Sequence, residues 1–454
     1  MTHTTSDAAA RSGQLSREER RVLAGTLVGT TIEWYDFFIY AQAAGVVLAP
    51  LFLAPVAKDN AGLAQVLSFA TIGISFLFRP LGAIVAGHLG DRLGRKKMLV
   101  FTLILMGLST SLIGILPTYA QAGIAAPVLL ILLRVIQGFS AGGEWGGAAL
   151  MAVEHAPRGR RGYFGAYPQI GVPIGMILAT FTLWLLTAVM GPAFGEWGWR
   201  IPFLLSIVLI AVGYLIRRAV EESPVFTQML ERRKESSAPL GQLFRYNLKE
   251  VVLTAVIFIA NNAAGYLLIA YFSTYAAKTL KMDQATVLLA TTLASFGWLG
   301  FTLWGGALSD RLGRIRTFQI GYGFLAIWAV PMWFLIDTKN IVWYFVALFV
   351  MTLGLGLSYG PQSALYAEMF PAKVRYSGVS IGYALGAILG GAFAPMIAEM
   401  LMNEFKASWT IGVYIAIAAV VSFIGVCLVK ETKGADLHVA EAHAEYAQEQ
   451  GPAN

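Results

Sequence analysis

Stretches of about twenty or more mostly apolar residues follow one another along nearly the whole chain, with short polar connections between them. One such stretch lets an α-helix cross the hydrocarbon core of a bilayer, which is about 30 Å thick. A single long polar interval, residues 217–249, divides the stretches into two groups of six. The pattern predicts twelve transmembrane helices, over residues 24–50, 62–89, 98–116, 125–154, 163–190, 199–219, 250–277, 284–309, 317–336, 341–369, 376–401 and 409–429.

The composition agrees with a chain whose main solvent is lipid. Of its 454 residues, 57% are hydrophobic and 13% are charged, and the mean hydropathy is +0.64. An ordinary soluble domain carries about 25% charged residues. The single cysteine, Cys427, leaves no intrachain disulfide and no thiol-based metal site. The polar N-terminus is not expected to be a cleavable signal peptide, because the apolar run after it is too long.

The positive charges are distributed unevenly between the two sides of the predicted membrane. Of the 33 Lys and Arg residues, 25 lie in the two tails and the even-numbered connections, 6 lie in the odd-numbered connections, and Arg79 and Arg134 lie within spans. The positive-inside rule therefore predicts a multi-pass protein of the cell (inner) membrane with both termini in the cytoplasm. Since topology explains the net charge of +7, the expected partner is the lipid bilayer and not nucleic acid.

Two sequence signatures occur twice, in the same order. GHLGDRLGRKK at 87–97 matches GALSDRLGRIR at 306–316, and EHAPRGRRGY at 154–163 matches EMFPAKVRYS at 368–377. Such repeats indicate two equivalent halves with a substrate bound between them near mid-membrane. The expected domains are an N-terminal tail (1–22), a six-helix bundle (23–219), a cytoplasmic linker (220–249), a second six-helix bundle (250–430) and a C-terminal tail (431–454).

These motifs resemble the major facilitator superfamily. The repeated G-x-x-x-D-R-x-G-R element and LLRVIQGFSAGG (132–143) carry this resemblance, which covers about residues 22 to 430. EWYDFFIY in the first span, FRPLGAIVAGHLGDRLGRKK and GGEWGGAALMAVEHAP look more narrowly like its metabolite:proton symporter branch, which includes carriers of citrate, oxoglutarate, shikimate, and proline or betaine. The resemblance implies the major facilitator fold, an all-α polytopic membrane protein, but does not reach the substrate.

Two departures from other patterns of the superfamily narrow the expectation. GAYPQIGVPIG (165–175) does not meet the span-5 signature of proton-driven drug exporters, G-x-x-x-G-P-x-x-G, which counts against efflux. The tail after Lys430 is shorter than the coiled-coil extension of osmosensing betaine carriers, so osmotic gating is not implied.

Two carboxylates lie three residues apart in the first apolar stretch, TTIEWYDFFIY (30–40). A charge at the centre of a membrane helix costs roughly 2.5–3.5 kcal/mol, so Glu33 and Asp36 require compensation. One interpretation is that at least one of them carries a proton, with Asp36 preferred because it lies near the middle of the span. The alternative is a structural ion pair or a hydrogen bond between packed helices.

Two further charged residues of the fourth span are candidates for proton coupling. Arg134 is a fixed positive charge that, placed near Asp36, would favour the ionised form of that carboxyl group. The resemblance implies the same role, because this arginine belongs to the span-4 motif that is linked to proton transfer in the superfamily. The alternative is an architectural ion pair. Glu144, in GGEWGG, is either a second coupling acid or a packing residue.

An anionic substrate would need a positive partner inside the membrane. The second half has no Lys or Arg well within a span, so this partner must be Arg79, which could instead pair with Glu33, or Arg134. The second half offers polar groups that could orient a small molecule, although hydrogen bonding between helices is the alternative for each. They are Asn261, Asn262, Tyr266, Tyr271, Tyr359, Gln362 and Tyr383.

The repeated signatures supply candidate gating residues. In the superfamily such turns make charge contacts that hold neighbouring helices in one conformation and break when the inner side opens. The candidates are Asp91, Arg92, Arg95, Glu154, Arg161, Asp310, Arg311, Arg314, Glu368 and Arg375.

The leading interpretation is a proton-coupled secondary symporter that imports a small organic acid or related metabolite by alternating access, as a functional monomer. The chain has no phosphate-binding loop and no paired nucleophile and base, so an enzyme is not expected. No metal or other cofactor is expected, with protons as the coupling ion. The alternatives are a proton-coupled exporter or antiporter, a uniporter, and, more distantly, a metabolite sensor that does not transport.

Overall fold

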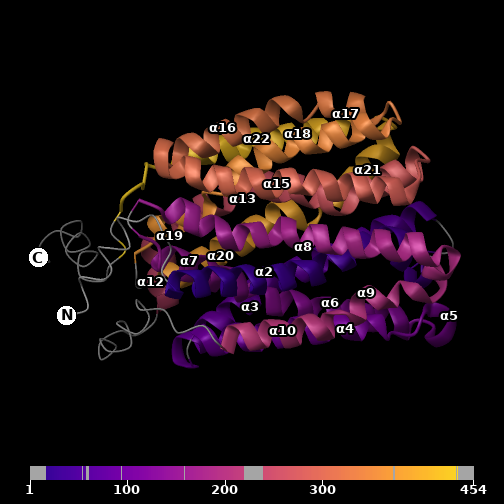
Figure 1. The fold of residues 1–454 in the computed structure, drawn as a ribbon, viewed down its shortest axis with the longest axis horizontal. Coiled ribbons are helices and arrows are strands. Elements are labelled where there is room, and N and C mark those ends of the chain that lie inside the picture. Colours follow the sequence, from indigo (N-terminus) through magenta and orange to yellow (C-terminus); the bar gives the residue numbers. More distant parts are fainter. Residues whose placement is uncertain are drawn as a thin grey trace, which may run out of the picture.

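The computed structural model describes residues 17–53, 55–57, 61–93, 95–157, 159–218, 239–371, 374–435 and 437 (Figure 1). Helices make up almost all of these residues, and no strand occurs among them. The helices lie roughly along one common axis. The first and last described helices, α2 and α22, begin and end at the same end of the bundle, which is called the terminal end below.

The first six predicted spans correspond to helices of the structure one by one. They are α2 (Arg17–Ala43) with η1 (Ala44–Leu53), α3 (Ala61–Leu93), α4 (Arg95–Gly114), α6 (Ala125–Gly142) with α7 (Glu144–Glu154), α8 (Arg161–Met190), and η2 (Phe194–Gly198) with α9 (Arg200–Leu204) and α10 (Ser206–Arg218). A short helix, α5 (Tyr119–Ala122), connects α4 to α6.

The second six spans follow α12 (Pro239–Tyr246), which lies within the predicted linker. They are α13 (Leu248–Tyr266) with η4 (Leu267–Tyr271), α14 (Phe272–Thr274) and η5 (Tyr275–Thr279), α15 (Gln284–Leu312), α16 (Arg314–Trp328) with α17 (Pro331–Ile336), α18 (Ile341–Tyr359) with α19 (Gln362–Met369), α20 (Arg375–Ala387) with η6 (Ile388–Ala392) and α21 (Ala394–Phe405), and α22 (Trp409–Cys427).

Not every span is one uninterrupted apolar helix. Among the described residues, nine helical stretches are long and apolar enough to cross a membrane, and the pair Glu19–Ala43 and Val47–Leu53, bent by 66°, would make a tenth. The apolar part of α4 is shorter, Val100–Gly114. The chain between α16 and α17 breaks before Pro331, because proline has no N–H to continue the hydrogen-bond ladder.

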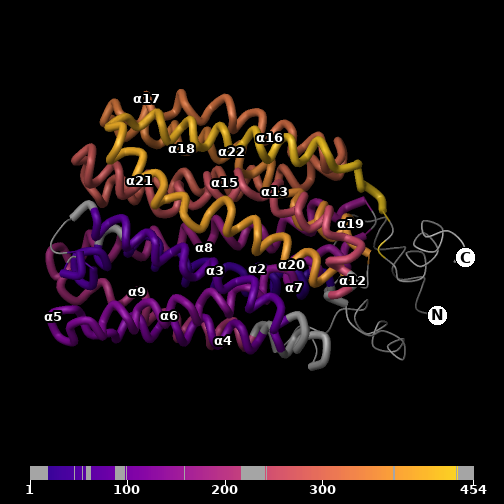
Figure 2. The backbone as a smooth tube through the Cα atoms, turned by 180° about the vertical axis from the view of Figure 1, so that it is seen from behind, coloured from indigo at the N-terminus to yellow at the C-terminus, as the bar shows by residue number. Residues whose placement is uncertain are grey.

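The two halves repeat one packing scheme. In the first half α2 packs on α8, α3 on α6, and α4 on α10, and the second half has the equivalent pairs α13 with α20, α15 with α18, and α16 with α22. The halves meet along two seams, where α8 runs beside α15 and where α3 lies against α20 and η6 (Figure 2). A side chain on the inner faces of these helices therefore lies between the halves.

Glycines bring the backbones of α3 and α6 into direct contact. A Cβ atom at Gly138 would overlap the carbonyl oxygen of Ser75, and one at Gly142 would overlap that of Arg79. Small residues of this kind permit close helix packing where lipid gives no hydrophobic driving force. The contact fixes Arg79 on α3 and Arg134 on α6 relative to each other.

We expect Gly138→Ala to lower the melting temperature of the purified protein, since the added methyl group must push α6 away from α3. Overpacking of this kind costs about 1–3 kcal/mol. Gly300→Ala is the matched control, because a Cβ atom at Gly300 on α15 meets nothing within 4 Å. Thermal unfolding in detergent measures both, and equal melting temperatures for the two variants would contradict the close contact.

Candidate functional site

Arg134 on α6 is completely buried near the seam between the halves. Its guanidinium group donates Nε–H to the carbonyl oxygen of Thr71 (3.3 Å), Nη2–H to Ser75 Oγ (3.1 Å) and Nη1–H to Gln137 Oε1 (2.5 Å). The same group lies over the Tyr40 ring, 3.8 Å from its centroid. All of these partners are neutral, and no carboxylate of the described residues forms an ion pair with Arg134.

Arg79 on α3 is a second buried cation without an ion pair among the described side chains. Its guanidinium carbon lies 4.2 Å from the centroid of the Phe76 ring, 4.9 Å from that of Phe37 and 5.6 Å from that of Trp34. Its Nε–H has no hydrogen-bond partner. Aromatic faces compensate a cation only in part, at about 0.5–2 kcal/mol for each contact.

The two arginines share one aromatic ring. The Phe37 centroid lies 4.8 Å from the guanidinium carbon of Arg134 and 4.9 Å from that of Arg79, and the two charges interact electrostatically. Two like charges away from bulk water are costly unless an anion joins them. The pair therefore forms a buried cationic centre in the first half of the chain.

Tyrosines of the second half face this centre. The Tyr266 ring lies 4.9 Å from Phe76 and 5.6 Å from Phe37 between centroids, and its hydroxyl group has no partner. Tyr383 and Tyr359 lie, like Tyr266, within electrostatic range of both Arg79 and Glu33. The structure thus brings together six of the residues that the sequence singled out, three of them from the opposite half.

An aromatic and amide layer lies beside these tyrosines. Trp145 stacks on Tyr383 with 3.8 Å between ring centroids and donates its indole N–H to Gln169 Oε1 (2.8 Å). Gln169 Nε2 donates to Gln362 Oε1 (3.3 Å) and to the carbonyl oxygen of Tyr359 (3.2 Å). Gln362 Nε2 has no partner. Gln362 was predicted from the sequence, whereas Trp145 and Gln169 were not. The amide of Gln169 within the apolar fifth span was a signal that could have indicated it.

The three other candidates of the second half have different contacts. Asn261 donates its amide N–H to the carbonyl oxygen of Leu355 (2.9 Å) and to Ser358 Oγ (2.8 Å), so it joins α13 to α18. Asn262 lies against the backbone of Gly391 in η6. Tyr271 lies in η4, on the side of the centre away from the terminal end, with its ring centroid 6.2 Å from that of Phe69.

Asp36 is buried on α2 and accepts a hydrogen bond at Oδ1 from Ser206 Oγ on α10. Thr110 on α4 also faces this carboxyl group, and Oδ2 has no hydrogen-bond partner. No ion pair joins Asp36 to Arg134 in the described structure. Glu33 lies one turn away on the same helix, within electrostatic range of Asp36.

Glu144, the third candidate acid, is buried at the start of α7. Its Oε2 accepts a hydrogen bond from Thr102 Oγ1 on α4 at 3.2 Å. The preceding residue, Gly143, accepts one from the hydroxyl group of Tyr376 on α20 (2.7 Å). This turn therefore touches the second half, whereas Glu144 itself binds a helix of its own half.

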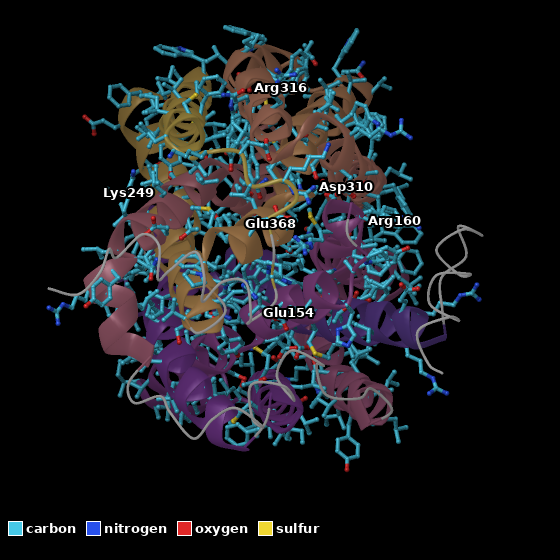
Figure 3. All side chains as sticks on the ribbon, turned by 90° about the vertical axis from the view of Figure 1, so that its left-hand side faces the viewer. Glu154, Arg160, Lys249, Asp310, Arg316 and Glu368 are labelled. Carbon is cyan, nitrogen blue, oxygen red and sulfur yellow. The ribbon has the colours of Figure 1, made fainter. Side chains whose placement is uncertain are left out.

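At the terminal end, charged side chains of the two halves pair across the seam. Figure 3 labels Glu154 and Glu368 at this end. Glu368 of α19 accepts from Arg314 at both carboxylate oxygens (3.1 Å each) and lies 3.5 Å from Arg161 Nη1 of α8. In the equivalent reverse contact, Arg375 Nη1 of α20 lies 3.7 Å from Glu154 Oε1 of α7. The second repeated signature therefore supplies both members of two ion pairs that cross between the halves.

Asp310 adds a further connection at this end. Its two carboxylate oxygens accept the backbone N–H groups of Gly162 and Tyr163 (2.8 Å each) in the first turn of α8. A carboxylate at a helix N-terminus is favoured by the helix dipole. Asp310 Oδ1 also accepts from Arg314 Nη1 (2.7 Å), and Arg311 beside it is exposed. The side chains of the first-half equivalents Asp91, Arg92 and Arg95 lie outside the described part of the structure.

The chain after α22 crosses this group of ion pairs. Arg161 Nη1 donates to the carbonyl oxygen of Ala435, and Arg375 Nη1 donates to that of Leu437 (3.3 Å). Thr432 Oγ1 donates to Glu368 Oε2 (3.1 Å). Residues after α22 thus contact the equivalent arginines of both halves, through Ala435 and Leu437.

The opposite end also has a contact between the halves. Lys278 Nζ of η5 donates to Gln65 Oε1 of α3 at 2.7 Å, across the seam. A small pocket opens nearby between η1 and α8 of the first half and η4, α14 and α15 of the second, lined among others by Gln42, Thr187 and Ser273. The described structure thus has contacts between the halves on both sides of the central arginines.

A two-repeat bundle of membrane helices with buried polar side chains between its halves is the architecture of a membrane transporter. Comparison with known proteins identifies the family: the model of the Major Facilitator Superfamily matches residues 26–384, and the chain belongs to this superfamily. It is therefore a multi-pass membrane transporter of a small-molecule metabolite and not an enzyme. The predicted twelve-helix, two-repeat fold and the resemblance found in the sequence are confirmed.

Two relatives and one solved structure illustrate this placement. The inner membrane metabolite transport protein YhjE of Escherichia coli is 40% identical over 422 residues, which are 91% of this chain and 94% of the relative. The shikimate transporter of Escherichia coli is 34% identical over 439 residues, 93% of this chain and 96% of the relative. The fold is also that of the proton:xylose symporter XylE, with a TM-score of 0.79 at 18% identity over 95% of this chain and 99% of that one.

We expect Glu368→Gln to loosen the terminal end, because Arg161 and Arg314 lose the carboxylate that they share. Breaking a buried ion pair costs about 3–5 kcal/mol, so the halves should separate there more often. The reporter is a cysteine at position 363 (Ser363→Cys), a buried position on α19, in a Cys427→Ser background. Glu368→Gln should raise the rate at which maleimide labels this cysteine at least several-fold. Arg316→Gln, at an exposed position of the same end, is the control; equal rates in both variants would refute this closure (Figure 3).

Proposed function

We propose that this protein is a proton-coupled symporter that imports a small organic acid across the inner membrane by alternating access. The observation that carries the proposal is the pair Arg79 and Arg134, two buried cations without a carboxylate partner among the described residues. A transported anion is the group that would neutralise them. Because this anion must leave again on the other side, a permanent counter-charge from the protein would work against transport.

The chemistry of the lining favours a carboxylate as that anion. An arginine fork binds the two oxygens of a carboxylate with parallel hydrogen bonds, and Arg79 has an unused Nε–H. Tyr266 and Tyr383 supply hydroxyl groups without partners from the opposite half, so a bound solute would touch both halves. The relative named as a shikimate transporter supports the same class, since shikimate is a hydroxylated carboxylate.

Asp36 is the proposed proton carrier. It lies near the middle of the first span and is fully buried. One of its carboxylate oxygens has no hydrogen-bond partner, and this oxygen could hold a proton. Glu33 and Glu144 remain candidates for the same role. Glu33 lies nearer to the tyrosines and Arg79, so a proton on Glu33 would act directly at the solute, whereas Glu144 is hydrogen-bonded to Thr102.

The ion pairs that cross the seam are the proposed gate on the cytoplasmic side. The distribution of Lys and Arg in the sequence supports a cytoplasmic terminal end. Opening inward would break Arg161–Glu368 and Arg375–Glu154 and would withdraw Asp310 from the first turn of α8. Arg311 and Arg314 belong to the same turn, and Asp91, Arg92 and Arg95 are the proposed equivalents in the first half. The protein is proposed to act as a monomer, since one chain contains both halves.

Asp36→Asn should abolish proton entry, because a neutral amide cannot take up and release a proton. Purified protein in liposomes loaded with a pH dye is given shikimate, other carboxylates, proline and glycine betaine from outside. Wild type should acidify the lumen with at least one of them, and Asp36→Asn should not, while exchange of labelled solute at equal concentrations continues. Glu404→Gln, an exposed acid of α21, is the control and should behave as wild type.

Other signals in this assay would point to other transport modes. Alkalinisation of the lumen indicates antiport, and uptake without a pH change indicates uniport. If liposomes with Asp36→Asn acidify at the wild-type rate, Asp36 is not the proton carrier.

Arg79→Gln should weaken binding of the solute that gives the signal, since a charge-assisted hydrogen bond is lost at a buried site. Such bonds contribute about 1.5–3 kcal/mol, or a factor of roughly ten to one hundred in KM. Arg79→Lys keeps the positive charge but not the two-pronged guanidinium group, so its KM should lie between those of Arg79→Gln and wild type. The concentration dependence of uptake measures all three, and an unchanged KM in Arg79→Gln would exclude this arginine from the binding site.

A further inference from the structure

Asp36 and Arg134 lie on neighbouring helices without an ion pair, yet one chain of buried polar side chains runs between them. We propose that Gln137 and Thr110 form a hydrogen-bonded bridge that transmits the protonation state of Asp36 to Arg134 and so controls how readily Arg134 binds an anion. The inference rests on the proposed symport and concerns the regulation of the same site. Gln137 and Thr110 are positioning residues in this bridge and do not touch the solute.

The contacts of the bridge are short and isolated from solvent. Gln137 Oε1 accepts from Arg134 Nη1 at 2.5 Å, and Gln137 Nε2 donates to Thr110 Oγ1 at 2.7 Å. Arg134, Gln137, Thr110 and Asp36 are all completely buried. These hydrogen bonds therefore join α6 to α4, between side chains that are shielded from the protein surface.

The last step of the bridge, between Thr110 and Asp36, is open in this structure. Thr110 lies one turn after Gly107 on α4, and a Cβ atom at Gly107 would be only 3.5 Å from Asp36 Oδ2, so this face of α4 lies against the carboxyl group. The Thr110 hydroxyl group donates to the carbonyl oxygen of Met106 at 3.0 Å, and Asp36 Oδ2 has no partner. The hydroxyl group thus has two acceptors within its range of rotation.

Hydrogen-bond polarity fixes the direction of the bridge. A guanidinium group can only donate, so the amide oxygen of Gln137 faces Arg134 and its NH₂ group faces Thr110. Thr110 Oγ1 therefore accepts from Gln137 and must donate its own proton, either to Met106 or to Asp36. An ionised Asp36 draws this proton because a carboxylate is the stronger acceptor. A protonated Asp36 releases it to Met106.

The two hydroxyl positions have different consequences for Arg134. With Asp36 ionised, each hydrogen bond of the chain polarises the next, and Gln137 Oε1 holds Arg134 Nη1 more strongly. With Asp36 protonated, this hold weakens and Arg134 is freer to turn its fork to an anion. Proton binding then favours anion binding, and by linkage anion binding favours proton binding to the same extent. This is the sign of coupling that symport requires.

Few other groups act on Asp36. On its own helix, Glu33 and Tyr35 lie within electrostatic range, and across from it α10 contributes Ser206 and α4 contributes Thr110. No cation of the described residues faces the carboxyl group. The uncharged bridge is therefore the structural connection between Asp36 and the arginine centre.

The test uses infrared difference spectra of the full-length protein titrated with acid, which need no solute. The carboxylic acid band of Asp36 is assigned by its loss in Asp36→Asn, and the guanidinium band of Arg134 by its change in Arg134→Lys. In wild type we expect the guanidinium band to shift with the same pH midpoint as the Asp36 band. In Thr110→Val, which keeps the shape of the side chain without the hydroxyl group, the Asp36 band should still titrate while the guanidinium shift is lost.

Thr110→Ser is the rescue variant, because it restores the hydroxyl group and should restore the guanidinium shift. Gln137→Met is a second test if Thr110→Val does not fold, and it should lose the shift as well. A full guanidinium shift in Thr110→Val or Gln137→Met, or no shift in wild type, overturns the bridge. Failure of the proposed symport is seen separately, as a pH-dye assay that stays silent for every solute while the infrared shift is present.

Discussion

Two buried positive charges without a carboxylate partner among the described residues are the constraint around which the centre of this transporter is arranged. Arg79 and Arg134 are held in place by the close contact of α3 and α6, where Gly138 and Gly142 let the backbones touch. The protein stabilises these charges with aromatic faces, carbonyl oxygens and neutral side chains. In the proposed function a solute would replace some of these neutral partners, whereas a fixed carboxylate would hold the arginines permanently.

The same logic explains why the true ion pairs lie elsewhere. At the terminal end Arg161–Glu368 and Arg375–Glu154 connect the halves directly, and the equivalent residues of the two repeats exchange partners. A contact between two rigid bundles that is made or broken as a unit suits a gate, because one motion disrupts every pair. In the proposed mechanism, charge pairing serves closure at the end of the bundle, and unpaired charge serves binding at its centre.

The proposed proton carrier and the proposed solute site occupy different places in this arrangement. Asp36 lies on the side of α2 that faces α4 and α10, whereas the tyrosines of the second half lie within electrostatic range of Arg79 and Glu33. A chain of neutral hydrogen-bonding groups can connect such points without bringing opposite charges together. In the proposed symport, this separation would let Asp36 hold a proton while an anion is bound, which a direct ion pair between Asp36 and Arg134 would oppose.

The sequence by itself determined the twelve spans, the two repeats and which charged residues lie inside the membrane. The length of an apolar run and the position of a charge within it are local properties, and they decide directly whether a segment is stable in the bilayer. Only the tertiary structure decided which side chains these polar and aromatic residues contact. Nothing local indicates that Asp36 accepts from Ser206, that Asn261 joins two helices, or that Trp145 stacks on Tyr383. These contacts join residues far apart in the chain, and they depend on how each helix is rotated about its axis, which is set by packing against its neighbours and not by hydropathy.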